Sequence, residues 1–318
     1  MRIATHAYTD AMLNQYNLLA SKQYTLQNQV STGLRVQAAS DDPVAMRNTL
    51  DYAAEKSAQT QYGANITTLQ SRGDTIYTAL QSLQTVSIRV GEIATSAATG
   101  TASTTASSSD LINYADEVNT LINRVVTAAN TKDPATGQYL FGGTASGSAP
   151  FTTTLDANKH VIAVTYNGNS SVNQSEIGSG QTTSVDIPGA STGAGGVRGL
   201  ITDPASGADF LNHLISLRDN LLAGNKTAIT STDSVNLLKD ENNLAYQVAN
   251  NGVQQNQLIA AATFATSRSQ SLDKMISNAS SADIMQTMVQ LNQAQTSYQA
   301  ALQSGAKIMQ LSILNYIQ

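Results

Sequence analysis

The sequence lacks cysteine and tryptophan, and it has only four phenylalanines among 318 residues. Without cysteine, disulfide bonds and thiolate metal sites are excluded, so stability must come from packing or from assembly. Only 12% of the residues are charged, and the net charge is −5. Such a chain cannot present a basic patch that neutralises several phosphates, which argues against nucleic acid as a partner.

Long apolar runs are also missing. No uninterrupted stretch of about 18 apolar residues occurs, so no membrane-spanning helix is predicted. The first residues do not read as a cleaved secretory signal, because Asp10, Asn14 and Gln15 interrupt any apolar core after Arg2. If the protein leaves the cell, we expect another export route to carry it.

Proline and glycine are scarce outside the middle of the chain. All five prolines lie between Pro43 and Pro204, and 11 of the 21 glycines fall within residues 139–205. The stretch "HVIAVTYNGN" at 160–169 is rich in β-branched residues and ends in Asn167-Gly168, a pair typical of hairpin turns. We therefore predict a small β-rich domain at 139–205, inserted between two helical halves.

Both ends of the chain carry apolar residues at alternating steps of three and four, the spacing of coiled coils. The predicted fold class is mainly α: a long, coiled-coil-like helical bundle formed by the N- and C-terminal halves. We expect terminal helices at 1–42 and 280–318, and a bundle core made by 43–138 and 206–279. The side chains expected to form an assembly interface on the terminal helices are Met12, Tyr16, Leu19, Leu26, Val30, Ile284, Met288, Leu291, Tyr298, Leu302, Met309 and Leu314.

The two ends are almost free of charge. The first 40 and last 38 residues contain six ionic side chains, namely Arg2, Asp10, Lys22, Arg35, Asp283 and Lys307. Charged groups avoid the buried parts of interfaces, and two weakly apolar helices bury too little surface to offset their ordering entropy. We predict that the ends are mobile in the free subunit and become helical when they dock on neighbouring copies.

The adjacent acids Asp41 and Asp42 could form a catalytic or metal-binding couple, but their context favours a joint between two helices. Gly33 follows a helical run and suits a C-terminal cap with positive φ. Asp42 followed by Pro43 is typical of an N-cap and a first helical residue. Asp41 would then favour the positive end of the new helix dipole.

No other stretch predicts chemistry. His6, His160 and His213 are far apart and have no zinc-ligand spacing. Glycine pairs occur in "YLFGGT" (139–144) and "GAGGVRG" (193–199), but no Lys-Ser/Thr follows them as a phosphate loop requires. We therefore predict no catalytic residue, no metal ligand and no cofactor.

Three segments together resemble the flagellin family. The segment "LQNQVSTGLRVQAASDDPVA" (26–45) is similar to the N-terminal segment of that family. The "DDPVA" form at 41–45, "GQYLFGGT" at 137–144 and the ending "LSILNYI" at 311–317 are similar to members at the hook–filament junction more than to filament subunits.

The resemblance implies a structural component of the bacterial flagellum that joins the hook to the flagellin filament. It implies secretion through the flagellar type III export apparatus and a location at the hook–filament junction. The implied partners are further copies of the chain in a ring or tube, the first hook-associated protein, flagellin and an export chaperone. The terminal helices would form the inner tube, the long paired helices the layer around it, and the β-rich insertion the outer face.

Other functions stay open at this point. A filament-forming flagellin has the same helical ends, and a surface homologue could bind glycans or receptors through the few aromatic residues of the insertion. An enzyme is disfavoured, because no polar residues converge in the pattern of a catalytic site. The segment "RVGEIA" (89–94) resembles a flagellin segment recognised by innate immune receptors. Gly91 stands where a second arginine is usual, so that recognition is not expected here.

Overall fold

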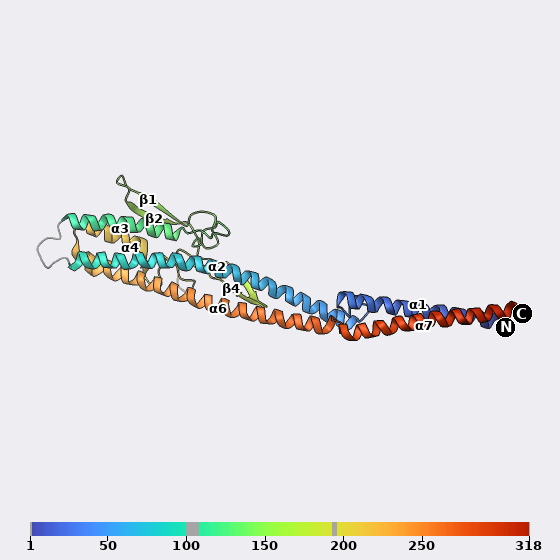
Figure 1. Cartoon of the computed structure of the whole chain (residues 1–318). Helices are drawn as coiled ribbons and strands as arrows, with labels where there is room; N and C mark the ends of the chain where they lie inside the picture. Colours follow the sequence, from blue (N-terminus) through green and yellow to red (C-terminus); the bar gives the residue numbers. More distant parts are fainter. Residues whose placement is uncertain (1, 100–107, 193–195, 318) are drawn as a thin grey trace. The chain divides into compact units, whose positions relative to one another are not determined.

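The computed structural model describes residues 2–99, 108–192 and 196–317, with side chains described within 10–98, 109–192 and 196–307. The structure is mainly α-helical with three small antiparallel sheets, which confirms the predicted fold class (Figure 1). The helices are α1 (Arg2–Thr32), α2 (Pro43–Thr99), α3 (Ser108–Ala129), α4 (Phe210–Leu222), α5 (Lys226–Ala228), the π-helix η1 (Ile229–Asp233), α6 (Ser234–Ser280) and α7 (Ile284–Ile317). The strands are β1 (Phe151–Leu155), β2 (Val161–Tyr166), β3 (Ser175–Gly178), β4 (Gln181–Thr183), β5 (Thr202–Asp203) and β6 (Ala208–Asp209).

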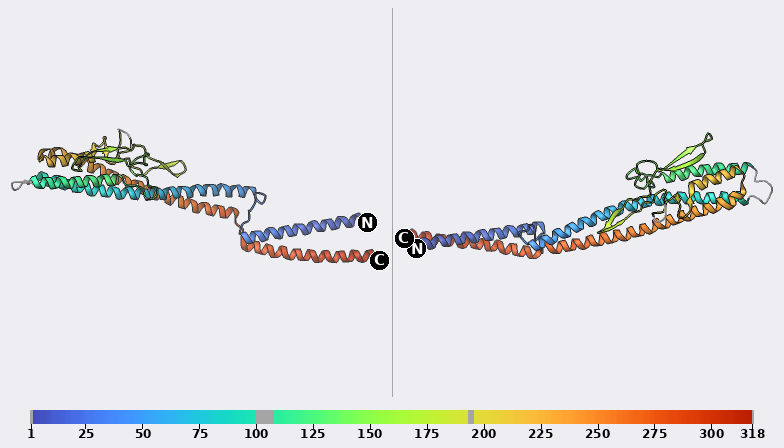
Figure 2. Two further views of the ribbon diagram at one scale, coloured as in Figure 1. Left: turned by 90° about the horizontal axis from the view of Figure 1, so that it is seen from above. Right: turned by 180° about the vertical axis from the view of Figure 1, so that it is seen from behind.

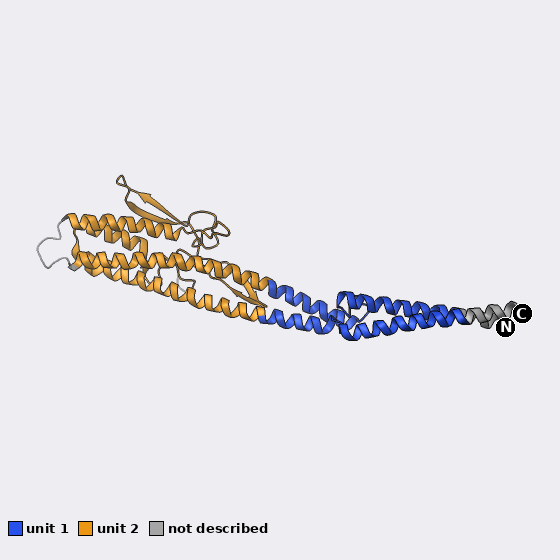
Figure 3. Cartoon of the chain, viewed as in Figure 1, with its two compact units in different colours: residues 1–60, 267–318 blue, residues 61–266 orange. Residues whose placement is uncertain are grey.

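The chain divides into two compact units (Figure 3). Unit 1 consists of residues 1–60 and 267–318, and unit 2 consists of residues 61–266. The long helices α2 and α6 contribute to both units. Within unit 1, α1 packs along α7, and the two lie side by side in every view (Figure 2).

The core of unit 2 forms where α2, α3, α4 and α6 meet. Each helix contributes apolar residues at steps of three and four, which places them on one face of that helix. The fully or nearly fully buried members include Ile76, Leu80, Leu83, Val118, Ile122, Val125, Leu214, Leu217, Leu244 and Leu258. This shared core explains how halves distant in sequence form one bundle.

The β-rich part of unit 2 consists of hairpins rather than one sheet. β1 pairs with β2, β3 with β4, and β5 with β6, all antiparallel. Residues 156–160 make the β1–β2 turn, where Asp156 Oδ1 accepts the N–H groups of Asn158 and His160. The prediction of a hairpin turn at Asn167-Gly168 is wrong, because the partner of β2 precedes it in the sequence.

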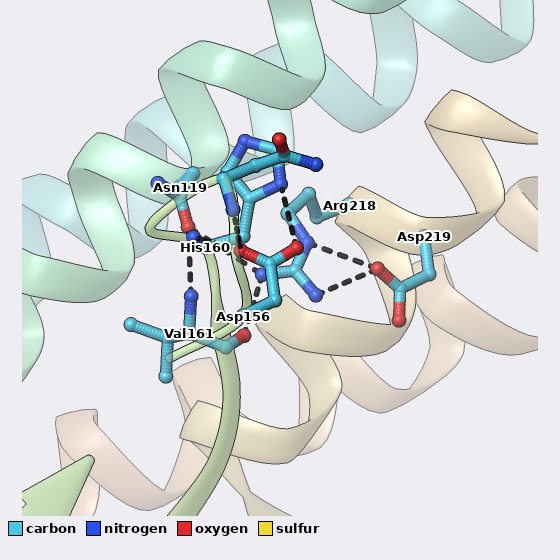
Figure 4. A network of polar contacts seen from close by, with 7 residues as sticks. Asn119, Asp156, His160, Val161, Arg218 and Asp219 are labelled. Atoms are coloured by element: carbon cyan, nitrogen blue, oxygen red, sulfur yellow. Dashed lines mark hydrogen bonds and ion pairs between the residues drawn. The ribbon is translucent and has the colours of Figure 1, made fainter. Parts of the chain in front are cut away.

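A buried arginine holds the β1–β2 hairpin against the helices (Figure 4). Arg218 of α4 donates through Nη1 to the carbonyl of Val161 at 2.5 Å, and through Nε and Nη2 to Asp219 Oδ1 at 2.9 and 2.7 Å. Asn119 of α3 accepts the Val161 N–H through Oδ1 at 3.3 Å. Since a buried guanidinium is costly without acceptors, these contacts fix the start of β2 at α3 and α4.

A second buried arginine joins α2 to the insertion. Arg72 donates through Nε to Asp186 at 2.5 Å and through Nη1 to Asp133 at 3.3 Å, and all three side chains are nearly buried. Asp133 follows α3, and Asp186 lies in the segment after β4. One side chain of α2 therefore positions two segments, one before the β1–β2 hairpin and one after the β3–β4 hairpin.

The buried face of α6 carries a row of amides. Asn243, Gln247, Asn251 and Gln255 follow one another at steps of four, so they lie on one face of the helix. Asn243 and Gln247 donate to carbonyls of 198–200, whereas Asn251 donates to Gly73 O and Gln255 to Gln70 O. The row thus aligns α6 with α2 and with the loop before β5.

Candidate assembly interface

The packing of α1 on α7 depends on small residues of α7. Tyr16 donates its hydroxyl to the carbonyl of Ala301 at 2.8 Å. A Cβ atom on Gly305 would collide with Tyr16 Oη and Met12 Cε, so a larger residue there would displace these two side chains of α1. The side of α7 that faces α1 contains Thr287, Leu291, Ala294, Tyr298, Ala301 and Gly305, which are buried or half-buried.

The predicted interface residues of α1 lie together on this seam. Leu26 is buried, and Met12, Tyr16, Leu19 and Val30 are half-buried. The predicted residues of α7 are divided between two faces. Leu291 and Tyr298 belong to the seam, whereas Ile284, Met288 and Leu302 are exposed. Met309 and Leu314 lie outside the residues whose side chains are described.

A large apolar surface remains uncovered on the α1–α7 pair. Met285 of α7 is 80% exposed, and eight other large apolar side chains on α1, on α7 and in the joint after α1 are at least 39% exposed. The nine exposed side chains are Leu13, Leu18, Tyr24, Leu34, Ile284, Met285, Met288, Val289 and Leu302. Single exposed apolar residues are normal on proteins, but a concentration of them on a nearly uncharged element marks an interaction surface.

The two connections that lead to the terminal helices are hydrogen-bonded to each other. Arg35 N–H donates to Ser280 O at 2.7 Å, and Ala282 N–H donates to Gly33 O at 2.8 Å. The Arg35 guanidinium reaches Ala279 O at 2.9 Å and Asp42 Oδ2 at 3.2 Å. Because both connections share these bonds, the start of α7 and the end of α1 are placed as one joint.

Gly33, Asp41 and Asp42 of the joint between α1 and α2 each have a hydrogen-bond partner close in sequence. Gly33 has φ +71°, and its N–H donates to Gln29 O at 2.9 Å. Asp42 Oδ1 accepts the N–H of Ala45 at 3.0 Å, which is the geometry of an N-cap, and Pro43 begins α2. Asp41 does not have the predicted role at the positive end of the α2 dipole. Its carboxylate accepts the N–H groups of Gln37 and Ala38 in the preceding turn.

These bonds perturb both carboxyl groups in the same direction. The backbone N–H groups of Gln37 and Ala38 lower the pKa of Asp41 below its ordinary value. The backbone N–H of Ala45, and then the guanidinium of Arg35, lower the pKa of Asp42. Both acids are therefore charged at neutral pH and occupied as acceptors, an arrangement that suits a joint and not proton transfer.

The described side chains give no sign of a metal or membrane site. Within them, no group of three or more His, Asp or Glu residues is placed to hold a metal ion. No helix among the described residues combines the length and the apolar character that a membrane crossing requires. The arrangement in unit 1 can pack against other helices, and its chemistry is that of burial and hydrogen bonding.

Sequence periodicity missed Thr287, Ala294 and Ala301 of the seam. Alanine is only weakly apolar and threonine is polar, so neither stands out in an apolar repeat. The larger neighbours Met288, Leu291 and Leu302 were therefore assigned to the repeat instead. A signal was present in the spacing of 287, 291, 294, 298, 301 and 305, which alternates four and three. Weighting small residues as contact positions would have found it.

Comparisons with known proteins agree with this architecture. Residues 3–146 match the family model of the bacterial flagellin N-terminal helical region. Comparison with curated protein sequences gives no match. Among solved structures, a Vibrio parahaemolyticus protein described as flagellar hook-associated is similar with a TM-score of 0.61 and 20% identity, over 76% of this chain and 100% of the other.

Two further structures show the same fold. FlgL of Bacillus cereus is similar with a TM-score of 0.55 and 15% identity, over 71% of this chain and 99% of the other. FlgL of Xanthomonas campestris is similar with a TM-score of 0.53 and 18% identity, over 70% of this chain and 98% of the other. The match over residues 3–146, which is less than half of the chain, shows that this N-terminal part is similar to the helical region of bacterial flagellins.

Proposed function

We propose that this chain is a structural subunit of the bacterial flagellum that joins the hook to the flagellin filament. The observation that carries the proposal is the uncovered apolar surface of α1 and α7 on terminal segments that are almost free of charge. A pair of helices with this surface is incomplete alone, and other helices of the same kind can complete it.

The terminal helices account for the assembly step. The ends at 1–42 and 280–318 are mobile before docking and form the inner tube afterwards, when neighbouring copies cover their exposed apolar side chains. The bundle core at 43–138 and 206–279 forms the surrounding layer, and the insertion at 139–205 faces outward. A contact between two different surfaces of identical copies, repeated about an axis, produces a ring or tube.

The partners follow from this role. They are further copies of the chain, the first hook-associated protein below, flagellin above, and a chaperone of the flagellar type III export apparatus before assembly. The similarity in fold to FlgL and to a hook-associated protein supports the junction. The role is structural and not enzymatic, since the polar groups of the joint already serve as caps and acceptors.

A filament-forming flagellin is the second candidate, because the matched family model describes the N-terminal helices of flagellins in general. The two roles differ in self-polymerisation. A junction subunit stops after a limited number of copies, whereas a filament subunit elongates from seeds of its own kind. Growth of long filaments by the purified chain would support the flagellin and contradict the junction.

Deletion of the gene in its motile host tests the junction role directly. The expected result is intact hooks without filaments, with flagellin released into the medium, and recovery of filaments when the gene is restored. Met288→Asp and Leu302→Asp should fail to restore filaments, because each places a carboxylate on the exposed apolar face of α7. Lys307→Gln, a change to an exposed polar side chain of the same helix, is the control. Normal filaments in the deletion strain would refute the proposal.

A further inference from the structure

Two Asn-Gly steps occur in the chain, Asn167–Gly168 and Asn251–Gly252. In this dipeptide, asparagine loses its side-chain amide more readily than before other residues, and no enzyme is needed. The attacking atom is the backbone nitrogen of the residue that follows asparagine, and glycine has no Cβ to obstruct the approach. Because the two steps share this chemistry, a difference between their rates reports on their surroundings in the folded chain.

The step Asn251–Gly252 is protected by α6. It lies well inside this helix, where each backbone N–H donates to the carbonyl four residues earlier. The Asn251 side chain is only 3% exposed, and its amide donates to Gly73 O of α2 at 3.3 Å. The nitrogen of Gly252 therefore reaches the Asn251 carboxamide only when this part of α6 opens, which is rare in the interior of a packed helix.

The step Asn167–Gly168 lacks this protection. It follows β2 and lies outside the helices and strands. Asn167 is exposed, and Gly168 is half-buried. No hydrogen bond from the Gly168 N–H is found within the described part of the chain, so the attacking nitrogen is not engaged as a donor there.

Among the described residues, a single hydrogen bond holds the Asn167 side chain. Its Nδ2 donates to Thr152 Oγ1 at 3.0 Å, and both side chains are exposed. A hydrogen bond contributes about 0.5–1.5 kcal/mol net, and water replaces an exposed one readily. The backbone N–H of Asn167 donates to Pro150 O at 2.8 Å, which fixes the residue on its N-terminal side. The carboxamide can therefore turn from Thr152 toward Gly168 while β1 and β2 stay paired.

We propose that Asn167 is a site of spontaneous deamidation in the folded protein. The Gly168 nitrogen forms a bond to Asn167 Cγ, the bond from Cγ to Nδ2 breaks, and ammonia leaves with the proton of the Gly168 N–H. Water then opens the five-membered imide, which leaves a carboxyl group and restores an N–H on Gly168. The sum is one water consumed and one ammonia released, with no change of oxidation state.

The fold accommodates one of the two products. Attack of water at Cγ yields aspartate, whose carboxylate can accept the Thr152 hydroxyl in place of the former amide contact. Attack at the main-chain carbonyl of Asn167 yields isoaspartate, which adds one atom to the main chain. This segment is tied to Pro150 O by the Asn167 N–H at 2.8 Å and to Gly142 O by the Asn169 N–H at 3.1 Å. Isoaspartate lengthens the chain between these ties, so aspartate is the product that the fold retains without rearrangement.

Deamidation adds a negative charge at the end of β2. An exposed aspartate is ionised at neutral pH, so each converted chain gains one negative charge. Because the ammonia is lost to solvent, the reaction is not reversed, and the converted fraction increases with the age of the folded chain. Older copies therefore carry a more negative β-rich part than new ones.

Incubation of the purified full-length protein at mildly alkaline pH tests the proposal. Samples are digested with pepsin at acidic pH, which stops the reaction, and mass spectrometry assigns each exchange of amide for acid to one residue. The expected result is conversion at Asn167 more than an order of magnitude faster than at Asn251. Asn173 is the matched control, because it is equally classed as exposed but is followed by Gln174, and it should convert several-fold more slowly than Asn167.

Two further measurements separate the fold from the local sequence. In guanidinium chloride both Asn-Gly steps should convert at similar rates, because α6 no longer protects Asn251. Ion-exchange chromatography of aged folded protein should show a more acidic form, which Asn167→Asp matches from the start. Asn167→Gln should remove most of this form, because ring closure from glutamine gives a larger ring and is slower.

Four results would overturn the proposal. Equal conversion of Asn167 and Asn251 in the folded protein would show that the fold does not distinguish them. A slow Asn251 in the unfolded protein would show that α6 is not the cause of its protection. Conversion of Asn173 as fast as Asn167 would remove the role of glycine, and an acidic form that persists in Asn167→Gln would place the reaction elsewhere.

Discussion

Two glycines of α2, Gly63 and Gly73, provide a quantitative test of how α2 and α6 are aligned. A Cβ atom on Gly63 would meet nothing within 4 Å. A Cβ atom on Gly73 would collide with the side-chain amide nitrogen of Gln255, which α6 directs at α2. Glycine to alanine can thus be compared at two sites of one helix. At Gly73 the new methyl group meets a side chain of α6, and at Gly63 it meets nothing.

The expected changes in unfolding free energy have opposite signs. Alanine in a helix interior is more stable than glycine by about 0.5–1 kcal/mol, so Gly63→Ala should stabilise unit 2 by that amount. Gly73→Ala has the same gain but displaces Gln255, whose amide donates to Gln70 O and Asp74 Oδ1, both at 3.2 Å. The two lost hydrogen bonds cost about 0.5–1.5 kcal/mol each, or about 1–3 kcal/mol together, so subtracting the helix gain leaves a net loss of up to about 2.5 kcal/mol.

Thermal unfolding followed by circular dichroism measures both changes. A domain of 150–250 residues shifts its Tm by about 2–4 °C per kcal/mol. We expect Gly63→Ala to raise the Tm and Gly73→Ala to lower it. In a Gln255→Ala background the collision is absent, so Gly73→Ala should become stabilising, which a double-mutant cycle resolves. The reasoning is refuted if Gly73→Ala raises the Tm like Gly63→Ala, or lowers it equally in both backgrounds.

Three further predictions concern the joint, the buried arginine and the exposed face of α7. The pKa values of Asp41 and Asp42 are lowered in the folded state, so their stabilising effect is complete above about pH 5 and is lost as the pH falls through the folded-state pKa values. Amide-exchange protection at Ala45 should decrease there, and Asp42→Asn should remove most of that pH dependence. Arg72→Met should destabilise unit 2 by about 3–5 kcal/mol in urea unfolding, because two nearly buried carboxylates lose their cation; a change below 1 kcal/mol would contradict the contact. Leu302→Asp should change the unfolding free energy of the monomer by less than about 0.5 kcal/mol, because Leu302 faces outward. A clear loss of monomer stability in this variant would contradict that placement.

The helical part of the fold was predictable from local patterns. The start of α2 at Pro43 followed from an aspartate–proline cap, and the seam of α1 followed from apolar residues at steps of four and three. Both signals act over a few residues, within one helix. The strands lie between Phe151 and Asp209, in the part of the chain where proline, glycine and β-branched residues gather.

Long-range polar contacts could not be predicted in the same way. Arg72 reaches Asp133 and Asp186, which are 61 and 114 residues away in the sequence. Arg218 reaches Val161, 57 residues away. Nothing local distinguishes these arginines from exposed ones, because their roles depend on which segments meet in the folded unit. The hairpin error has a related cause, since Asn167-Gly168 has the composition of a turn but the strand that follows it does not pair back.

The division of residues on α7 bears on the proposed assembly. If α7 docked on neighbouring copies alone, its large apolar residues could be spread around the whole helix. Instead Ala301 and Gly305 face Tyr16, where bulk would separate the two helices, whereas Met288 and Leu302 face outward. α1 shows a related division, with Leu26 buried and Leu13 and Leu18 exposed. Since both helices keep large apolar residues for the outer face, the proposed assembly would bury a surface to which both ends of the chain contribute.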